Sequence, residues 1–345
     1  MALVLLSALG WDALWGEPHV AFHPVVWMGK YLSACGRVTV RCPPAPAFAL
    51  GALAWCLGAL VIGALAWGVQ TLAFRELALL LAQWDAGERN AVDSIVAAGG
   101  PGISYAGMAW LIPLFIFLAG LLKTMLSWRM LRDETGAVEV ALRHSLQAGR
   151  ERLAMLVSRD TSALSETEVR ESAIESLAEN LNDSVVAPIF WHILLGLPGA
   201  AVYRFANTAD AMWGYRGLRN GVDWEWAGKW AARADDVLSW LPARVTALLL
   251  ARAAGGLRYP ALREEARKTP SPNSGWPMAA MALGLGVQLC KPGVYVLNPT
   301  GRPAQAADMS LAQKYASKVV VASYLWALVA IALMIAVLKI DGVFR

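Results

Sequence analysis

The chain has 345 residues, of which 57% are hydrophobic and 16% are charged, and its mean hydropathy is +0.46. This composition is typical of a membrane protein and excludes an ordinary soluble domain. The net charge of +4 is spread thinly, without a basic cluster among aromatic residues, which argues against a nucleic-acid partner. The spacing of Cys35, Cys42, Cys56 and Cys290 indicates neither a zinc site nor a disulfide framework.

Four apolar stretches are long enough to cross a bilayer, which takes about 20 residues. They cover residues 47–74, 94–122, 184–203 and 319–338. We therefore expect an all-α integral membrane protein, a polytopic helical bundle in which residues 1–345 form one membrane-embedded domain.

The distribution of Lys and Arg predicts how the chain is oriented. Segment 123–183 carries eight Lys/Arg and segment 204–318 carries fifteen, whereas the short segment 75–93 carries two. The positive-inside rule places the first two in the cytoplasm and predicts that 75–93 is an outside loop. We expect an integral protein of the cell (inner) membrane with its active site facing the cytoplasm.

Segment 184–203 does not fit this orientation as a plain spanning helix. A single crossing would separate 123–183 from 204–318, although both are expected in the cytoplasm. Pro188 and the turn at 197–199 would also leave backbone groups that lipid cannot satisfy. We therefore predict a re-entrant helix, or one shielded from lipid by neighbouring helices.

An acidic helix is predicted just before that segment. Ser165 and Glu168 form a capping-box pattern that marks its start. Four acids then follow at steps of four and form one stripe, opposite an apolar face: Glu171, Glu175, Glu179 and Asp183 against Ile174, Leu177, Leu181 and Val185. A solvated helix face is the ordinary interpretation, but acids beside a membrane-buried segment usually face a cavity, a cation or a substrate path.

Several polar motifs stand out in this apolar chain. They are Gly16-Glu17-Pro18-His19 with His23-Pro24-Val25, and the stretches 158–162, 175–180, 207–216, 231–244 and 271–277. Taken in order, these motifs closely resemble the CobD/CbiB family of cobalamin biosynthesis over nearly the whole chain. Two positions depart from the family pattern, because Glu17 replaces a frequent Asp and Met278 replaces a frequent acid.

The resemblance implies an adenosylcobinamide-phosphate synthase, which is an ATP-dependent, amide-forming ligase. Such enzymes join adenosylcobyric acid to (R)-1-amino-2-propanol O-phosphate, or to the free amino alcohol, with ATP and Mg²⁺. The corrinoid is a substrate here and not a cofactor. Membrane lipid and other late cobalamin-biosynthesis enzymes are the further partners that the resemblance implies.

Amide formation requires an activated carboxylate, most simply an acyl phosphate, and an uncharged amine. Magnesium prefers oxygen ligands and usually keeps several waters. The predicted metal ligands are Glu175, Glu179, Asp183 and Asp210, and the predicted catalytic residues are Glu175, Glu179 and His23. The predicted substrate- and phosphate-binding residues are Arg159, Asn180, Arg204, Asn207, Arg216 and Asn273.

Structural roles remain open for some of these groups. Asp210 could instead cap a helix or pair with an arginine, and Asp235 with Asp236 could form a buried ion network. No Walker A sequence is present, so any ATP binds without a P-loop.

Two other functions compete with the synthase. A transporter would also place acids beside membrane segments. The sequence shows no inverted repeats and contains long polar segments, and both observations argue against a transporter. A non-catalytic membrane scaffold for late corrinoid enzymes is the second alternative.

Overall fold

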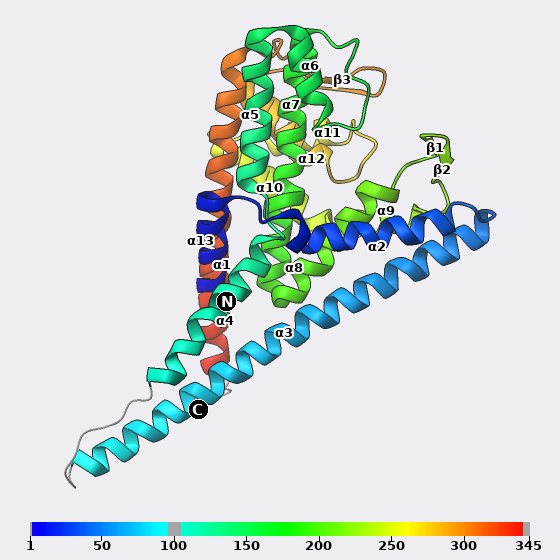
Figure 1. The fold of residues 1–345 in the computed structure, drawn as a ribbon. Helices are drawn as coiled ribbons and strands as arrows, with labels where there is room; N and C mark the ends of the chain where they lie inside the picture. The colour runs from blue at the N-terminus through cyan, green and yellow to red at the C-terminus, as the bar shows by residue number, and fades with distance from the viewer. Residues whose placement is uncertain (1, 96–104, 341–345) are drawn as a thin grey trace.

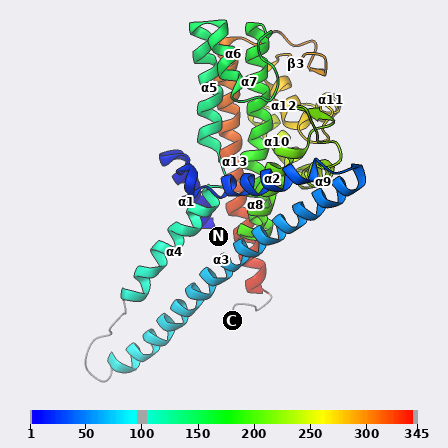
Figure 2. The same ribbon diagram turned by 45° about the vertical axis from the view of Figure 1, so that its right-hand side comes forward.

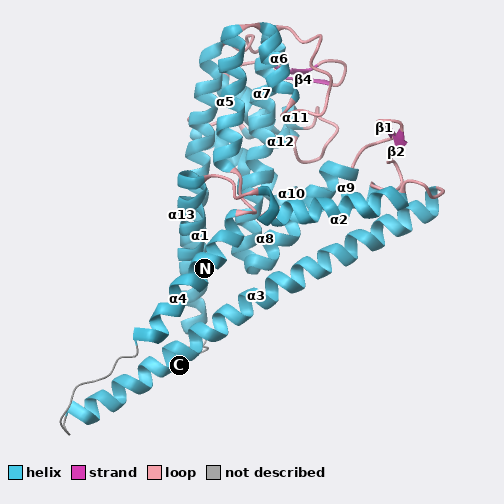
Figure 3. Cartoon of the chain, viewed as in Figure 1, coloured by secondary structure: helices cyan, strands magenta, loops and turns pink. Residues whose placement is uncertain are grey.

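The computed structural model describes the backbone of residues 2–95 and 105–340, with the side chains of 80–111 and of part of 326–340 outside the described set. The fold is almost entirely helical (Figure 3). Its elements are α1 Ala2–Trp15, η1 Val20–Phe22, α2 Pro24–Thr39, α3 Pro44–Ile95, α4 Tyr105–Lys123, α5 Trp128–His144, α6 Leu146–Ala154, α7 Glu166–Leu181, the π-helix η2 Asn182–Val186, α8 Ala187–Trp213, β1 Leu218–Arg219, β2 Val222–Asp223, α9 Lys229–Leu238, α10 Trp240–Ala253, α11 Tyr259–Ala266, α12 Gly275–Leu285, β3 Leu289–Lys291, β4 Tyr295–Leu297 and α13 Ala306–Ile340.

The helices form an upper body, from which two long helices extend downward (Figures 1 and 2). Helices α5, α6, α7 and α10–α12 lie in the upper body with one end of α13, while α3 and α4 extend downward. Among the described residues, three helical runs are long and apolar enough to cross a membrane: Pro44–Leu79, Ile112–His144 and Glu166–Trp213. The expected fold class, a helical membrane protein, is confirmed.

The expected spans fall on these elements to different degrees. Span 47–74 lies within α3, and span 319–338 lies within α13. Residues 96–104 of span 94–122 lie outside the described residues, and the rest of that span belongs to α4.

The stretch 75–93 is not the predicted loop, because α3 continues as a helix to Ile95, and its location outside the cytoplasm stays a prediction. The charges in this stretch are embedded among Leu, Ala, Gln and Glu, which are strong helix formers. Two basic residues in an otherwise helix-favouring sequence do not end a helix.

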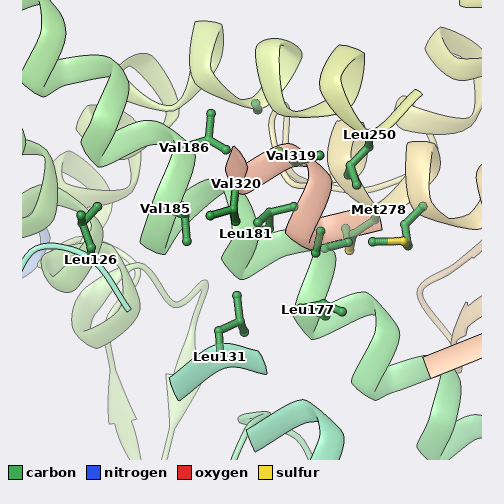
Figure 4. Packing of buried hydrophobic residues seen from close by; sticks show 14 of the residues in the cluster. Leu126, Leu131, Leu177, Leu181, Val185, Val186, Leu250, Met278, Val319 and Val320 are labelled. Atoms are coloured by element: carbon green, nitrogen blue, oxygen red, sulfur yellow. The ribbon is translucent and has the colours of Figure 1, made fainter. Parts of the chain in front are cut away.

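The core is built around the apolar face of α7, as the spacing predicts (Figure 4). Leu177, Leu181 and Val185 are fully buried. They pack among residues of four other helices, namely Leu131 of α5, Leu250 of α10, Met278 of α12, and Val319 and Val320 of α13. Each fully buried aliphatic side chain contributes about 1.5–3 kcal/mol, so α7 is held firmly in place.

The chain reverses direction within α8. Gly196 has φ 70° and ψ −155°, a conformation that is essentially restricted to glycine. Ser184 and Arg204 lie on opposite sides of this glycine in the chain. Arg204 Nη1 nevertheless donates to Ser184 Oγ at 3.2 Å, whereas a straight helix would separate the two residues by about 30 Å. The amide of Leu197 donates to Gln70 Oε1 of α3 at 2.7 Å, which satisfies a group freed by the turn.

The turn folds α8 into a helical hairpin, and the placement of 184–203 as a re-entrant or shielded segment stays a prediction. Leu194 and Leu195, beside the turn, are 56% and 59% exposed. Because the second arm returns alongside the first, Asp183 and Asp210 lie on the same side of the turn.

The π-helix η2 joins α7 to the hairpin and redirects two carbonyl groups. Ser184 O accepts from the amide of Ser127 at 3.0 Å, and Asp183 O accepts from Arg204 Nη1 at 3.4 Å. A π-helical turn frees such carbonyls from the α-helical ladder, and these turns occur frequently at functional sites.

We predict that Gly196→Ala destabilises the protein strongly. An alanine would strain the backbone by about 1–3 kcal/mol, and its Cβ would also overlap the side-chain amide of Gln70. Gly68→Ala in α3 is the matched control, because no atom lies within 4 Å of an added Cβ there. Thermal unfolding in detergent should show a clear loss for the first variant and none for the second. Equal stabilities would contradict the described turn.

Candidate functional site

The acidic stripe of α7 begins at the predicted capping box. Ser165 Oγ accepts from the amide of Glu168 at 3.3 Å, and Glu168 Oε2 accepts from the amide of Ser165 at 2.7 Å. Farther along the helix, Glu171 and Glu175 are 2% and 6% exposed. This part of the stripe is therefore not a solvated helix face. Burying a carboxylate is costly, so both groups need partners within the protein.

A distant part of the chain supplies those partners. The amide of Cys290 in β3 donates to Glu171 Oε2 at 3.1 Å, and the Tyr295 hydroxyl in β4 donates to Glu175 Oε1. Burial and the nearby charge of Glu175 raise the pKa of Tyr295, so its phenol stays protonated and remains a donor. The β3–β4 hairpin thus covers one side of the stripe.

A small polar cavity lies against α7, and we name it the α7 pocket. Its volume is about 150 Å³. It is lined by Leu156, Val157, Ser158, Arg159, Ser172, Glu175, Ser176, Glu179, Asn180 and Lys291. Four predicted site residues, Arg159, Glu175, Glu179 and Asn180, therefore share one cavity.

Arg159 reaches into this cavity from the loop before α7. Its Nη2 donates to Ser172 Oγ at 2.6 Å and lies 3.6 Å from Glu175 Oε2. Arg159 Nε and Nη1 are buried without a hydrogen-bond partner, and so is Glu175 Oε2. These atoms leave donors and an acceptor available within the same pocket.

A second group, the aspartate cluster, contains Asp183, Asp210, Asp235 and Asp236. Asn207 lies close to both Asp183 and Asp235, which brings the hairpin and α9 together. Burial raises the pKa of Asp235 well above its usual range, and the charges of Asp183, Asp210 and Asp236 raise it further. Asp235 Oδ1 is buried without a hydrogen-bond partner.

Glu179 connects the α7 pocket with the aspartate cluster. It interacts electrostatically with Glu175 and Lys291 on the pocket side and with Asp183 and Asp210 on the cluster side. Within the described part of the chain, no group of three or more His, Cys, Asp or Glu side chains is close enough together to hold a metal ion. The four-carboxylate metal site therefore stays a prediction.

Arg204 contacts the aspartate cluster, because its Nη1 donates hydrogen bonds to Ser184 Oγ and to Asp183 O. Arg216 instead lines a separate cavity of about 300 Å³, the α9 pocket. The other residues that line the α9 pocket are Gly214, Tyr215, Glu225, Gly228, Lys229, Ala232, Arg233 and Asp236. Asp236 thus belongs both to the cluster and to this second cavity.

Asn273 has local partners that hold its loop in place. Its Nδ2 donates to Asp236 O at 2.7 Å, and its Oδ1 accepts from Arg244 Nη1 at 3.0 Å. Asn273 lines neither of the two pockets, so the contacts that the structure gives it are structural.

His23 belongs to a third group of charges. Its Nε2 lies 3.1 Å from Glu17 Oε2, and the same carboxylate is 2.7 Å from Lys123 Nζ. Lys123 also lies 3.1 Å from Asp12 Oδ1. Glu17 interacts electrostatically with Arg204, so this group borders the aspartate cluster.

Sequence reasoning missed Lys291 and Tyr295. Both belong to the β3–β4 hairpin, which is more than a hundred residues from α7 in the chain. No local spacing connects them to the acidic stripe. Their isolation as polar residues after the apolar α12 is the only sequence signal that could have drawn attention to them.

Residues 5–323 match the CobD/CbiB protein family. Among curated relatives, a probable cobalamin biosynthesis protein CobD of Methanothermobacter thermautotrophicus is 38% identical and the match covers 88% of each chain. One of Thermococcus kodakarensis, named likewise, is 40% identical over 84% of this chain and 83% of the relative.

A cobalamin biosynthesis protein CobD of Dehalococcoides mccartyi is 36% identical over 87% of this chain and 88% of the relative. No solved structure matches the chain significantly. The ordered motifs, the helical membrane fold and these relatives agree, and the chain belongs to the CobD/CbiB family of cobalamin biosynthesis proteins.

Proposed function

We propose that this protein is an adenosylcobinamide-phosphate synthase. It joins the propionate carboxylate of adenosylcobyric acid to the amine of (R)-1-amino-2-propanol O-phosphate, or of the free amino alcohol, in an ATP- and Mg²⁺-dependent ligase reaction. The observation that carries this proposal is the α7 pocket, which holds carboxylates and cations and includes Glu179, a residue that also feels the charges of Asp183 and Asp210 in the aspartate cluster.

The residues of the α7 pocket suit the amine partner of the reaction. An ammonium group must lose a proton before it can attack a carboxyl carbon. Glu175 and Glu179 are carboxylates within the pocket and can accept that proton. We assign them as the catalytic residues, while a direct role for His23, which is paired with Glu17, stays a prediction.

The aspartate cluster is chemically suited to Mg²⁺ although no three-carboxylate site is preformed among the described residues. All its side chains offer oxygen, and Asp235 Oδ1 is buried and unpartnered. Magnesium usually takes only one or two protein carboxylates and keeps several waters. Asp183 and Asp210 would hold it, and bound Mg²⁺ with ATP would supply an activating phosphoryl group with its charge neutralised.

The α9 pocket gives a second place for anionic groups. Arg216, Lys229 and Arg233 line it, and Asp236 links it to the aspartate cluster. We assign it to phosphates of the nucleotide, because it is cationic and larger than the α7 pocket.

A corrinoid is far larger than either pocket, so only its propionate arm can enter. The ring would then rest outside, with the reacting carboxyl group delivered toward Glu179 in the α7 pocket. The charge of segments 123–183 and 204–318 supports a cytoplasmic location for this site.

The direct test is an assay of detergent-purified protein with adenosylcobyric acid, ATP, Mg²⁺ and aminopropanol phosphate. We expect turnover, and we expect Glu179→Gln to lower kcat/KM by about a hundredfold, the usual scale for losing a general base. Glu166→Gln is the matched control, because this carboxylate is on the same helix but exposed and paired with Arg170. Lack of turnover in the unaltered protein would favour a scaffold, and full activity of Glu179→Gln would remove its catalytic role.

Magnesium binding can be tested without turnover. We predict that Mg²⁺ raises the Tm of the purified protein, because a ligand that binds only the folded state stabilises it. Asp210→Asn should lose most of that increase, whereas Asp133→Asn, whose carboxylate is exposed and pairs with Arg132, should keep it. An equal increase in both variants would show that the cation binds elsewhere.

A further inference from the structure

The α7 pocket contains charges of both signs within a small volume. Arg159 and Lys291 are its cations, and Glu175 and Glu179 are its carboxylates. Arg159 Nη2 and Glu175 Oε2 form an ion pair at 3.6 Å, which is too long for a hydrogen bond. The buried atoms Arg159 Nε and Nη1 and Glu175 Oε2 therefore keep their hydrogen-bonding capacity for something else.

Unpartnered buried atoms show what such a ligand must offer. Arg159 Nε and Nη1 need an acceptor, and Glu175 Oε2 needs a donor. Glu175 is only 6% exposed, so water access to its carboxylate is restricted. Leaving a buried polar atom without a partner destabilises the protein, and a ligand that satisfies all three atoms would recover that cost.

The pocket volume limits the size of that ligand. An internal cavity of about 150 Å³ holds a molecule of roughly the size of benzene, and the α7 pocket is of that size. A corrin ring or a complete nucleoside triphosphate does not fit. A short molecule with an anion at one end and an amine at the other does.

We infer that the α7 pocket binds the amine substrate in its phosphorylated form, with the phosphate on Arg159 and Lys291 and the ammonium on Glu175 and Glu179. This inference rests on the proposed function and deepens it, because it assigns the preference for a phosphate monoester to two named cations. Guanidinium groups match phosphate oxygens geometrically, and lysine adds a point charge. Lys291 is thus a specificity-determining residue.

Calorimetric titration of the full-length, detergent-purified protein tests the inference without ATP or corrinoid. The probes are 1-amino-2-propanol O-phosphate, free 1-amino-2-propanol and inorganic phosphate. We expect the phosphorylated amine to bind about tenfold or more tightly than either of the others, since hydrogen bonds to charged groups are stronger than those between neutral groups.

Variants then locate the phosphate. Lys291→Gln should weaken binding of the phosphorylated amine about tenfold and leave binding of the free amine unchanged. Lys291→Arg, which keeps the positive charge, should retain the tighter binding of the phosphorylated amine. Lys229→Gln, in the α9 pocket, is the matched control and should have no effect on this probe. Thermal unfolding of each variant confirms that it is folded.

The assignment would be overturned if Lys229→Gln, but not Lys291→Gln, lost the tighter binding of the phosphorylated amine. Equal affinity of the unaltered protein for the phosphorylated and free amines would also overturn it. If the protein turns over its substrates but Lys291→Gln still binds the phosphorylated amine more tightly than the free amine, only this inference is refuted. Binding as expected without turnover would count against the proposed synthase alone.

Discussion

At Gly196 the chain leaves the helical conformation for one residue, and this reversal brings Asp183 and Asp210 to the same end of the hairpin. The reversal is stable because its freed polar groups have partners: Leu197 donates to Gln70, and Arg204 reaches back to Ser184 and Asp183. Unsatisfied backbone groups cannot persist in an apolar environment. A helix continuing straight would carry the second half of the aspartate cluster away from the first.

The site that results is rich in buried carboxylates. Glu171 and Glu175 are stabilised by donors from the β3–β4 hairpin, whereas Asp235 is buried beside three other aspartates. Buried like charges repel strongly at low dielectric. Such an arrangement is expected where a cation or a cationic substrate completes the site, and it is the physical basis for assigning both Mg²⁺ and an amine to this region.

Local sequence patterns predicted the parts of this structure that depend on local rules. The capping box at Ser165, the apolar face around Leu177 and the conflict at 184–203 all follow from spacing, charge and proline chemistry. Residues 75–93 form a helix where a loop is predicted, because a low count of basic residues does not outweigh helix propensity. Lys291 could not be found, because the packing of β3 on α7 is a long-range contact that no periodicity encodes. The metal-ligand set stays untested because ligation depends on side-chain convergence, which spacing along one helix does not determine.

The reversal at Gly196 can be measured directly by the distance between spin labels on Glu166→Cys and Ala211→Cys, two exposed positions on either side of it, after removal of the four free cysteines. The hairpin predicts roughly 25–35 Å, from a rise of 1.5 Å per residue along each arm. A continuous helix through Gly196 would place the labels about 68 Å apart. A dominant long distance would contradict the hairpin and, with it, the shared site of Asp183 and Asp210.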